Sequence, residues 1–371
     1  IIMVEYLSGN RIQGSSTSSS SPPQTSWKLL ARGVYDASDP DSIDTGTFTP
    51  KENMMILAHF IHSDQIKPNL RLGYSTIDDG DNYAWRGSQN GGTNAPSSAS
   101  DGHSQNEVTP INHQASGTIF ATGAFTNTSG KEKLGVLHYN YSGTDSAVGD
   151  RSEITFKWAN TSNQVNRIEY VNGGTGSFGS GSEVVVIGCD NNEADGGTTT
   201  PNFWQQLVDE TSDSTGDFSV SFTAKKYLWV QTIGEGDGNN RTSFRMQFNG
   251  NTTSGDYKFR TQDDGKTTSE GTHGDSYISI ADTLGAANQS GNSGNTQVYV
   301  EQFIVNRETQ YALGIHHSAS NQPDTLGGSA VMDRRETVSK FRSTTPITSI
   351  KMTSSGDTFP VGTRIIVWGA D

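Results

Sequence analysis

Short runs rich in β-forming residues recur along the whole chain, and many alternate apolar with polar positions. Arginine separates two leucines in Leu70–Leu72, and it separates two larger apolar residues in Phe244–Met246. This period of two predicts antiparallel strands with one buried face and one face toward water. Clusters of Gly, Asn, Asp and Ser separate the runs, as at turns. In the first half of the chain the predicted strands are 54–61, 70–74, 118–125, 133–139, 154–158, 167–171 and 183–188.

The same runs return in the second half in the same order. FTPKENMMILAHFI from Phe48 matches FTAKKYLWVQTIG from Phe222, and KLGVLHY from Lys133 matches ALGIHHS from Ala312. The offset changes from 174 to 179 positions between these two pairs, as expected when loops change length while strands keep their register. The match ends with FGSGSEVVVIGCD, closing at Asp190, over FPVGTRIIVWGAD. This repetition predicts a tandem duplication.

The predicted fold is therefore all-β, with two tandem antiparallel β-sandwiches preceded by a flexible N-terminal arm. So many short strands with uneven loops in each copy favour two sheets packed face to face, and a jelly roll fits best. The polar segment NNEADGGTTTP is typical of a linker. We expect an arm with a Ser-rich spacer at 1–26, the first sandwich at 27–190, the linker at 191–201 and the second sandwich at 202–371.

The arm combines an apolar segment with a low-complexity spacer. Its spacer, SSTSSSSPPQTS, has the composition of a flexible tether. A purely solvated tail has no use for apolar side chains, so we expect the segment before the spacer to act as an anchor. The anchoring residues would be Val4, Tyr6, Leu7 and Ile12. A terminus without a partner is the alternative.

Composition narrows the classes of partner. The net charge is −14 with a pI near 4.9, so the chain lacks the basic footprint that nucleic-acid binding requires. Hydrophobic residues make up only 31%, and the balance is largely Gly, Ser, Thr and Asn, which suits β-domains with long polar loops. No apolar run approaches the roughly 20 residues of a membrane-spanning helix. The single cysteine, Cys189, ends an apolar run and is expected to be a small buried residue.

Motifs of catalysis and metal binding are absent from the sequence. It contains no GxSxG, HExxH, P-loop or CxxC motif, so we expect neither an enzyme nor a cofactor. His138 and His317 fall at the same repeat position and are expected to pack at a sheet edge or to bond a loop. His316 and His317 would point to opposite faces of a strand and could not chelate one metal ion together. The remaining histidines are scattered at 59, 62, 103, 113 and 273.

Acidic, glycine-containing loops raise the alternative of structural calcium. They begin at Asp78 (DDGDN), Asp190 (DNNEADGG) and Glu235 (EGDGNN). None matches the twelve-residue EF-hand pattern, and tight β-turns use the same residue types. We therefore expect turns and no bound metal.

A set of arginine and aromatic residues recurs in both copies. Two interpretations are open: a scaffold of cross-strand pairs and core aromatics, or a groove that binds a glycan or a protein partner. Recurrence in both halves favours the scaffold. The set comprises Arg71, Tyr83, Trp85 and Arg86 in the first copy and Arg245, Tyr257, Phe259 and Arg260 in the second.

The two closing segments, NTSNQVNRIEYVNGGTGSFGSGSEVVVIG (160–188) and STTPITSIKMTSSGDTFPVGTRIIVWG (343–369), resemble the final hairpin of jelly-roll domains in tailed-phage and related viral structural proteins. The opening EYLSGNRIQGSS also resembles the start of uncharacterised marine viral proteins. The endings Ile187-Gly188-Cys189 and Trp368-Gly369-Ala370 depart from the aromatic-Gly-Ile ending usual there. Such a last strand lies inside the sandwich and is apolar on both faces.

This resemblance implies a non-enzymatic structural protein at the virion surface: a decoration protein, head fibre or coat component anchored through its arm. Its partners would be other virion proteins and copies of itself, with a trimer favoured. One alternative is a pair of carbohydrate-binding modules that recognise a host glycan. The other is a cell-surface filament subunit joined by strand donation.

Overall fold

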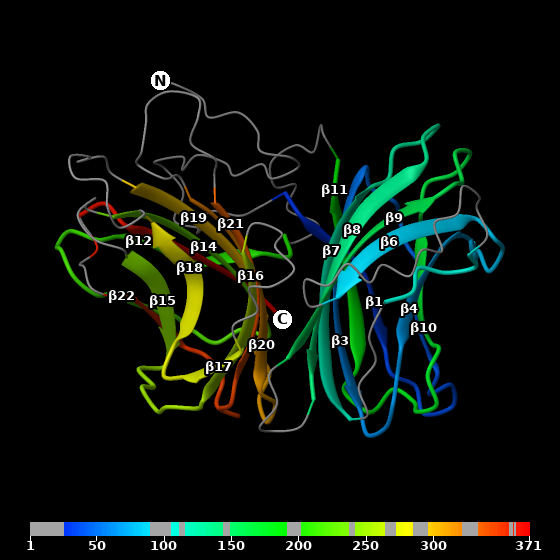
Figure 1. Ribbon diagram of the computed structural model, residues 1–371. Helices are drawn as coiled ribbons and strands as arrows, with labels where there is room; N and C mark the ends of the chain where they lie inside the picture. The colour runs from blue at the N-terminus through cyan, green and yellow to red at the C-terminus, as the bar shows by residue number, and fades with distance from the viewer. Residues whose placement is uncertain are drawn as a thin grey trace. The chain divides into compact units, whose positions relative to one another are not determined.

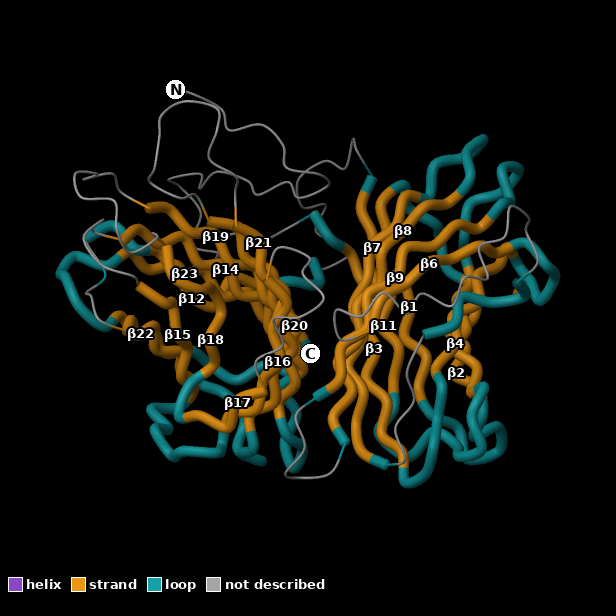
Figure 2. Tube along the Cα trace, in the orientation of Figure 1, coloured by secondary structure: helices purple, strands orange, loops and turns teal. Residues whose placement is uncertain are grey.

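The described part of the chain consists of strands, turns and loops and contains no helix (Figure 2). The structure is a computed structural model. It describes residues 26–89, 105–110, 116–143, 149–190, 202–236, 242–263, 272–284, 296–320, 333–355, 359 and 361–371. The chain forms two compact units: the second contains Gln206–Asp371 and Gly149, and the other described residues up to Gln205 belong to the first. The predicted arm and the linker at 191–201 lie outside the described residues, except Ser26.

The first unit is a two-sheet sandwich (Figure 1). Its strands are β1 (Lys28–Val34), β2 (Ser42–Thr47), β3 (Asn53–His62), β4 (Pro68–Tyr74), β5 (Thr76–Ile77), β6 (Tyr83–Gln89), β7 (Gly117–Thr126), β8 (Lys133–Ser142), β9 (Asp150–Trp158), β10 (Arg167–Asn172) and β11 (Glu183–Cys189). The large sheet has the order β1-β11-β3-β7-β8-β9-β6, and the small sheet has the order β2-β10-β4-β5.

The second unit has the same plan. Its strands are β12 (Gln205–Thr211), β13 (Phe218–Ser221), β14 (Tyr227–Gly236), β15 (Thr242–Phe248), β16 (Tyr257–Asp263), β17 (Thr272–Asp275), β18 (Ile278–Leu284), β19 (Thr296–Val305), β20 (Ala312–Ser320), β21 (Asp333–Phe341), β22 (Ser349–Ser355) and β23 (Arg364–Ala370). The large sheet runs β12-β23-β14-β19-β20-β21-β16-β17, and the small sheet runs β13-β22-β15-β18.

Both units have jelly-roll strand order. In each, the first strand pairs with the last, the last with the third, and the third with a strand from the middle of the chain segment, all within one sheet. The second strand and the penultimate strand meet in the other sheet. Chain segments that alternate in this way between two sheets form the double Greek key of a jelly roll. An added group, β8-β9-β6 or β20-β21-β16-β17, widens the large sheet.

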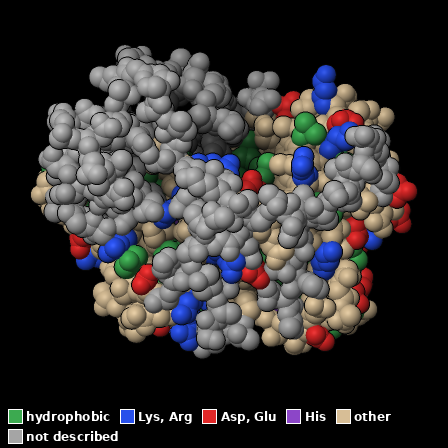
Figure 3. Space-filling model, viewed as in Figure 1, with side chains coloured by type: hydrophobic (Ala, Val, Ile, Leu, Met, Phe, Trp, Pro, Cys, Tyr) green, Lys and Arg blue, Asp and Glu red, His purple; other side chains and the backbone are tan. Residues whose placement is uncertain are grey.

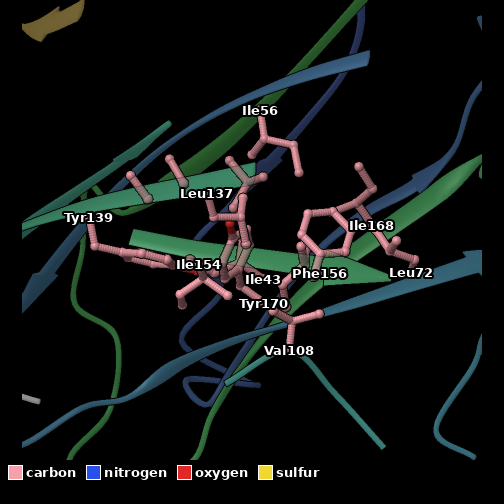
Figure 4. Close-up of a cluster of buried hydrophobic side chains, with 14 of the residues drawn as sticks. Ile43, Ile56, Leu72, Val108, Leu137, Tyr139, Ile154, Phe156, Ile168 and Tyr170 are labelled. Atoms are coloured by element: carbon pink, nitrogen blue, oxygen red, sulfur yellow. The ribbon is translucent and has the colours of Figure 1, made fainter. Parts of the chain in front are cut away.

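Each unit encloses its own apolar core between its two sheets. Alternate residues of the large sheet point inward, as Ile56, Leu137 and Ile154 do in the first unit, where they meet Leu72 and Ile168 of the small sheet (Figure 4). The second unit has a corresponding cluster around Val230, Val300, Phe244 and Met352. The period-two pattern read from the sequence therefore selects the inward side chains.

The closing strands are apolar on both faces, as the sequence predicts. Every residue of β11 is buried, including Cys189, and every residue of β23 after Arg364 is buried. Each strand lies between two others near one edge of its large sheet. Because both faces of each closing strand are buried, its sequence shows no alternation of apolar and polar residues.

The boundary between the two units differs from the sequence prediction. Asn202 was expected to open the second sandwich, but it forms an isolated antiparallel bridge with Lys28 at the start of β1. The amide of Phe203 donates to the carbonyl of Trp27 over 2.8 Å. Residues 202–203 therefore cover the outer edge of β1, and the second unit begins only afterwards, near β12.

Candidate functional site

The two repeated tyrosines serve the same structural purpose in both units. The Tyr83 hydroxyl in β6 accepts the amide of Leu72 in β4 at 2.8 Å and lies 2.8 Å from the Leu72 carbonyl. The Tyr257 hydroxyl in β16 accepts the amide of Phe248 in β15 at 2.8 Å. Each ring is fully buried, and burial raises the pKa of both hydroxyl groups, to about 12 for Tyr257. Each tyrosine therefore ties the large sheet to the backbone of the small sheet.

The other aromatic residues of the recurring set also belong to the interior. Trp85 and Phe259 are buried and belong to the core clusters of their units. Their neighbours in sequence differ in exposure, since Arg86 is exposed and Arg260 is half-buried. Trp85 consequently presents no open aromatic platform to a sugar ring.

Arg71 and Arg245 occupy matching positions but contact different groups. Arg71 binds Glu107 through Nε at 3.1 Å and Nη2 at 2.9 Å, and its Nη1 lies 3.6 Å from Glu169 on the neighbouring strand β10. Arg245 instead lies over the ring of Tyr277, 4.0 Å from its centroid. Arg71 makes the cross-strand carboxylate pair that the scaffold interpretation expects, and Arg245 makes a cation–π contact.

A buried asparagine shows how closely the two units agree. Asn127 accepts the amide of Val165 through Oδ1 at 2.6 Å and donates to the carbonyl of Lys51 at 2.9 Å. Asn306, at the matching position, accepts the amide of Ile347 at 2.6 Å and donates to the carbonyl of Lys225 at 3.0 Å. In each unit this side chain joins two loops that are distant in sequence.

The closing motifs make matching contacts as well. Asp190 accepts the amide of Glu52 at 3.0 Å and pairs with Lys51 at 2.9 Å. Asp371 accepts the amide of Lys226 at 3.2 Å and pairs with Lys225 at 2.5 Å. Asp190 thus joins the end of β11 to the loop before β3, and Asp371 joins the end of β23 to the loop before β14. These contacts stabilise the fold in both units.

The prediction that His138 and His317 lie at a sheet edge is wrong. His138 is in β8, inside the large sheet, and faces Glu153 of β9 in the strand register. His317 is in β20 and faces Glu336 of β21. In each case the glutamate forms an ion pair with the arginine two residues earlier, at 3.4 Å in the first unit and 3.1 Å in the second. The sequence predicted the recurrence but not the position, because it did not show that β6 and β16 pair beyond β9 and β21.

A polar row crosses the inward face of the large sheet in the second unit. Gln302 of β19 is in register with His316 of β20, and His316 is in register with Thr337 of β21. His316 and Ser339 are joined by a hydrogen bond of 2.5 Å between Nε2 and Oγ. All these side chains are buried on the side of the apolar core. We use the name polar row for Thr232, Gln302, His316, Thr337 and Ser339.

Several polar atoms of this row have no hydrogen-bond partner among the described residues. They are Gln302 Nε2 and Oε1, His316 Nδ1, Thr337 Oγ1 and Thr232 Oγ1. Desolvation by burial lowers the pKa of His316 to about 3, with a smaller contribution from His317, so its imidazole stays neutral at physiological pH. Buried polar groups in native proteins are almost always hydrogen-bonded. The first unit also has such atoms, on Tyr139, Tyr141, Ser152 and Tyr170, but at other positions.

The first unit is apolar at the matching positions. Leu137 pairs with Gly123 and Ile154 in its strand register, as His316 pairs with Gln302 and Thr337. Leu137 and Ile154 belong to the core shown in Figure 4. The polar row is therefore a difference between the two interiors at matching positions, and it is the candidate functional site.

Sequence reasoning missed this row, although a signal was present. At the offset that places His317 over His138, His316 falls over Leu137. Comparing the inward positions of the two copies one by one would have shown polar residues replacing apolar ones. The sequence pattern His316–His317 by itself raises only the question of metal chelation.

The acidic loops do not form a metal site among the described residues. Asp78 accepts hydrogen bonds from the amide of Gly80 at 3.0 Å and from the Trp158 indole at 2.7 Å, so its carboxylate is used within a turn. No cluster of three His, Cys, Asp or Glu side chains is placed to hold a metal in the described ranges. The sequence DNNEADGG after Asp190 and the side chains of EGDGNN lie outside them, as do Val4, Tyr6, Leu7 and Ile12.

No family model and no curated protein matches the chain. Among solved structures, the crystal structure of Pseudomonas aeruginosa OccK7 (OpdD) aligns with 11% identity over 86% of this chain and 98% of that chain, with a TM-score of 0.12. A similarity this low carries no argument about fold or function. In the described part of the chain, no helix has the length and apolarity needed to cross a bilayer.

Proposed function

We propose that this protein is a non-enzymatic structural component of a virus particle, displayed at the virion surface. The observation that supports this most is the pair of tandem jelly-roll units whose recurring tyrosines, asparagines and closing aspartates make matching structural contacts. Tyr83 and Tyr257 tie the sheets together, and Asn127 and Asn306 join the loops, so recurrence follows the fold rather than a reaction. The resemblance of the closing segments to viral jelly rolls gives this architecture its biological setting.

The proposal includes an assembly mode. The arm at residues 1–26, with its apolar Val4, Tyr6, Leu7 and Ile12, anchors the chain to other virion proteins, and copies of the chain associate with one another as a trimer. Lys and Arg side chains lie at several separate places on the face shown in Figure 3, with Asp and Glu between them. Such a mixed surface on an acidic chain suits solubility and association with proteins rather than nucleic acid.

The carbohydrate-binding alternative receives no specific support. A carbohydrate site of this kind would use Trp85 as its aromatic platform, but the Trp85 side chain is packed in the core of the first unit. Trp85→Ala would therefore lower stability whether or not a glycan binds, and it cannot test lectin activity.

Deletion of residues 3–20 tests the anchoring step. We expect the truncated chain to keep the circular dichroism and unfolding transitions of the full chain but to be missing from purified particles. The matched control keeps the length and the apolar segment but replaces residues 15–24 with a Gly/Ser sequence, and it should be incorporated normally. Normal incorporation of the deletion variant would overturn anchoring through the arm.

A further inference from the structure

The polar row of the second unit is enclosed by apolar side chains. Thr232, Gln302 and Thr337 alternate along their strands with residues that point away from the core, and their inward neighbours include Val230 and Val300. Strand β18 packs over β20 and β21 and contributes Ile278 and Ile280 to the same core. Apart from the hydrogen bond between His316 and Ser339, the amide, imidazole and hydroxyl groups of the row therefore lie beside apolar side chains that offer them no hydrogen bond.

Leaving these atoms without hydrogen-bond partners would lower the stability of the folded chain. Each buried donor or acceptor with no partner lowers the free energy of unfolding by about 1–3 kcal/mol. At least four side chains contribute such atoms here. Replacement by apolar residues is structurally feasible, because the first unit has Gly123, Leu137 and Ile154 at the matching positions. The second unit must therefore satisfy these atoms with a group outside the described side chains.

The chemistry of the row indicates which group this is. Gln302 presents both a donor and an acceptor, the threonine hydroxyls can do either, and His316 Nδ1 is a donor or an acceptor according to which nitrogen carries the proton. Arg335 lies on the same face and is bound to Ser279 Oγ at 2.9 Å. A neutral molecule that both donates and accepts fits this mixture, whereas a metal ion would find a single imidazole and no carboxylate cluster in the described ranges.

We propose that the polar row binds a chain of ordered water molecules inside the second unit, between β18 and the large sheet. The waters bridge Gln302, His316 Nδ1 and Thr337, and one reaches Thr232. Internal waters typically make about three hydrogen bonds to buried polar groups, which matches the density of free polar atoms along the row. The first unit is apolar at the matching positions Gly123, Leu137 and Ile154, so it has no counterpart of this chain there.

Two measurements on the full chain test this proposal. A crystal structure at about 1.5 Å should show solvent peaks within hydrogen-bond distance of His316 Nδ1 and of the Gln302 amide. Oxygen-17 relaxation dispersion should detect long-lived internal waters in the wild type. The variant Gln302→Gly/His316→Leu/Thr337→Ile, which copies the first unit at these positions, should lose the part of that signal that comes from the row. His317→Leu, one residue along on the opposite face, should retain it.

Three results would overturn the proposal: Gln302 and His316 bonded to other side chains with no solvent between them, density of a molecule other than water, or an unchanged relaxation signal in the triple variant. If the triple variant fails to fold, the crystal structure and the His317→Leu comparison still decide the question.

Discussion

At the scale of single residues, the most informative groups are the buried tyrosine hydroxyls. A tyrosine in a core normally keeps its hydroxyl at a polar boundary, but Tyr83 and Tyr257 are fully buried. Their full burial is possible because each hydroxyl forms hydrogen bonds with the backbone of the opposite sheet. Tyr83 bonds Leu72, and Tyr257 bonds Phe248. The ring supplies apolar area and the hydroxyl fixes how the two sheets approach each other.

Tyr83→Phe should lower the free energy of unfolding by about 1–3 kcal/mol, because the bond to the Leu72 backbone is lost while the ring remains. Urea unfolding followed by tryptophan fluorescence measures this. Tyr74→Phe is the matched control, since Tyr74 is an exposed tyrosine of the same small sheet, and its effect should stay within about 0.5 kcal/mol. Equal effects of the two substitutions would contradict the role given to the Tyr83 hydroxyl.

His316 should make stability depend on pH. Burial lowers its pKa to about 3 in the folded chain, whereas a histidine of the unfolded chain titrates near 6.5. Between these values only the unfolded chain takes up the proton. His316 therefore does not destabilise the folded chain above about pH 6.5, and its destabilising effect grows as the pH falls toward 3. The free energy of unfolding should therefore fall less between about pH 7 and about pH 5 in His316→Leu than in the wild type. Parallel pH profiles of the two proteins would contradict a neutral, buried His316.

At the scale of elements, the strands were predictable wherever the sequence alternates strongly or contains a continuous run of β-forming apolar residues. The runs around Met54–Ile61 and 118–125 became β3 and β7, and the closing run became β11. Strand β2 was missed because SIDTGT contains one large apolar residue, Ile43, and forms an edge of the small sheet. Edge strands need few buried side chains, so local pattern identifies them poorly.

The loops are held by side chains that no local pattern reveals. Asn127 and Asn306 each bond backbone groups of two separate segments, and this arrangement depends on tertiary contacts. We expect Asn127→Ala and Asn306→Ala each to lower the free energy of unfolding of its own unit by about 1–3 kcal/mol. Asn163→Ala, in a partly exposed turn, should change it by less than about 0.5 kcal/mol. Urea titration of the three variants gives the comparison, and a negligible effect of both buried substitutions would refute this account of the loops.

At the scale of the whole molecule, repetition predicted two units of one fold, and the strand orders agree. The candidate site was less accessible to sequence reasoning, which favoured residues shared by both copies, such as Tyr83 and Tyr257. Those residues proved to be bound within the scaffold, whereas the distinctive residues, including His316 and Gln302, occur in one copy only. Their burial, and the absence of partners for His316 Nδ1 and the Gln302 amide among the described residues, depend on the register between four strands, which composition and spacing do not specify.

The polar row should also make the second unit the less stable of the two. Its interior replaces Leu137 and Ile154 of the first unit with His316 and Thr337, so less apolar area is removed from water on folding. Hydrogen exchange should therefore show lower protection in β19 and β20 than in β7 and β8. Faster exchange in the first unit would contradict this ordering.

The central claim is that this chain builds virus particles, and a reconstruction of purified particles by electron cryomicroscopy tests it most directly. The account predicts surface density into which both jelly-roll units fit at a fixed number of copies per symmetry axis, with quantitative mass spectrometry giving the same copy number. Particles that are complete and infectious without any copy of this chain would contradict it.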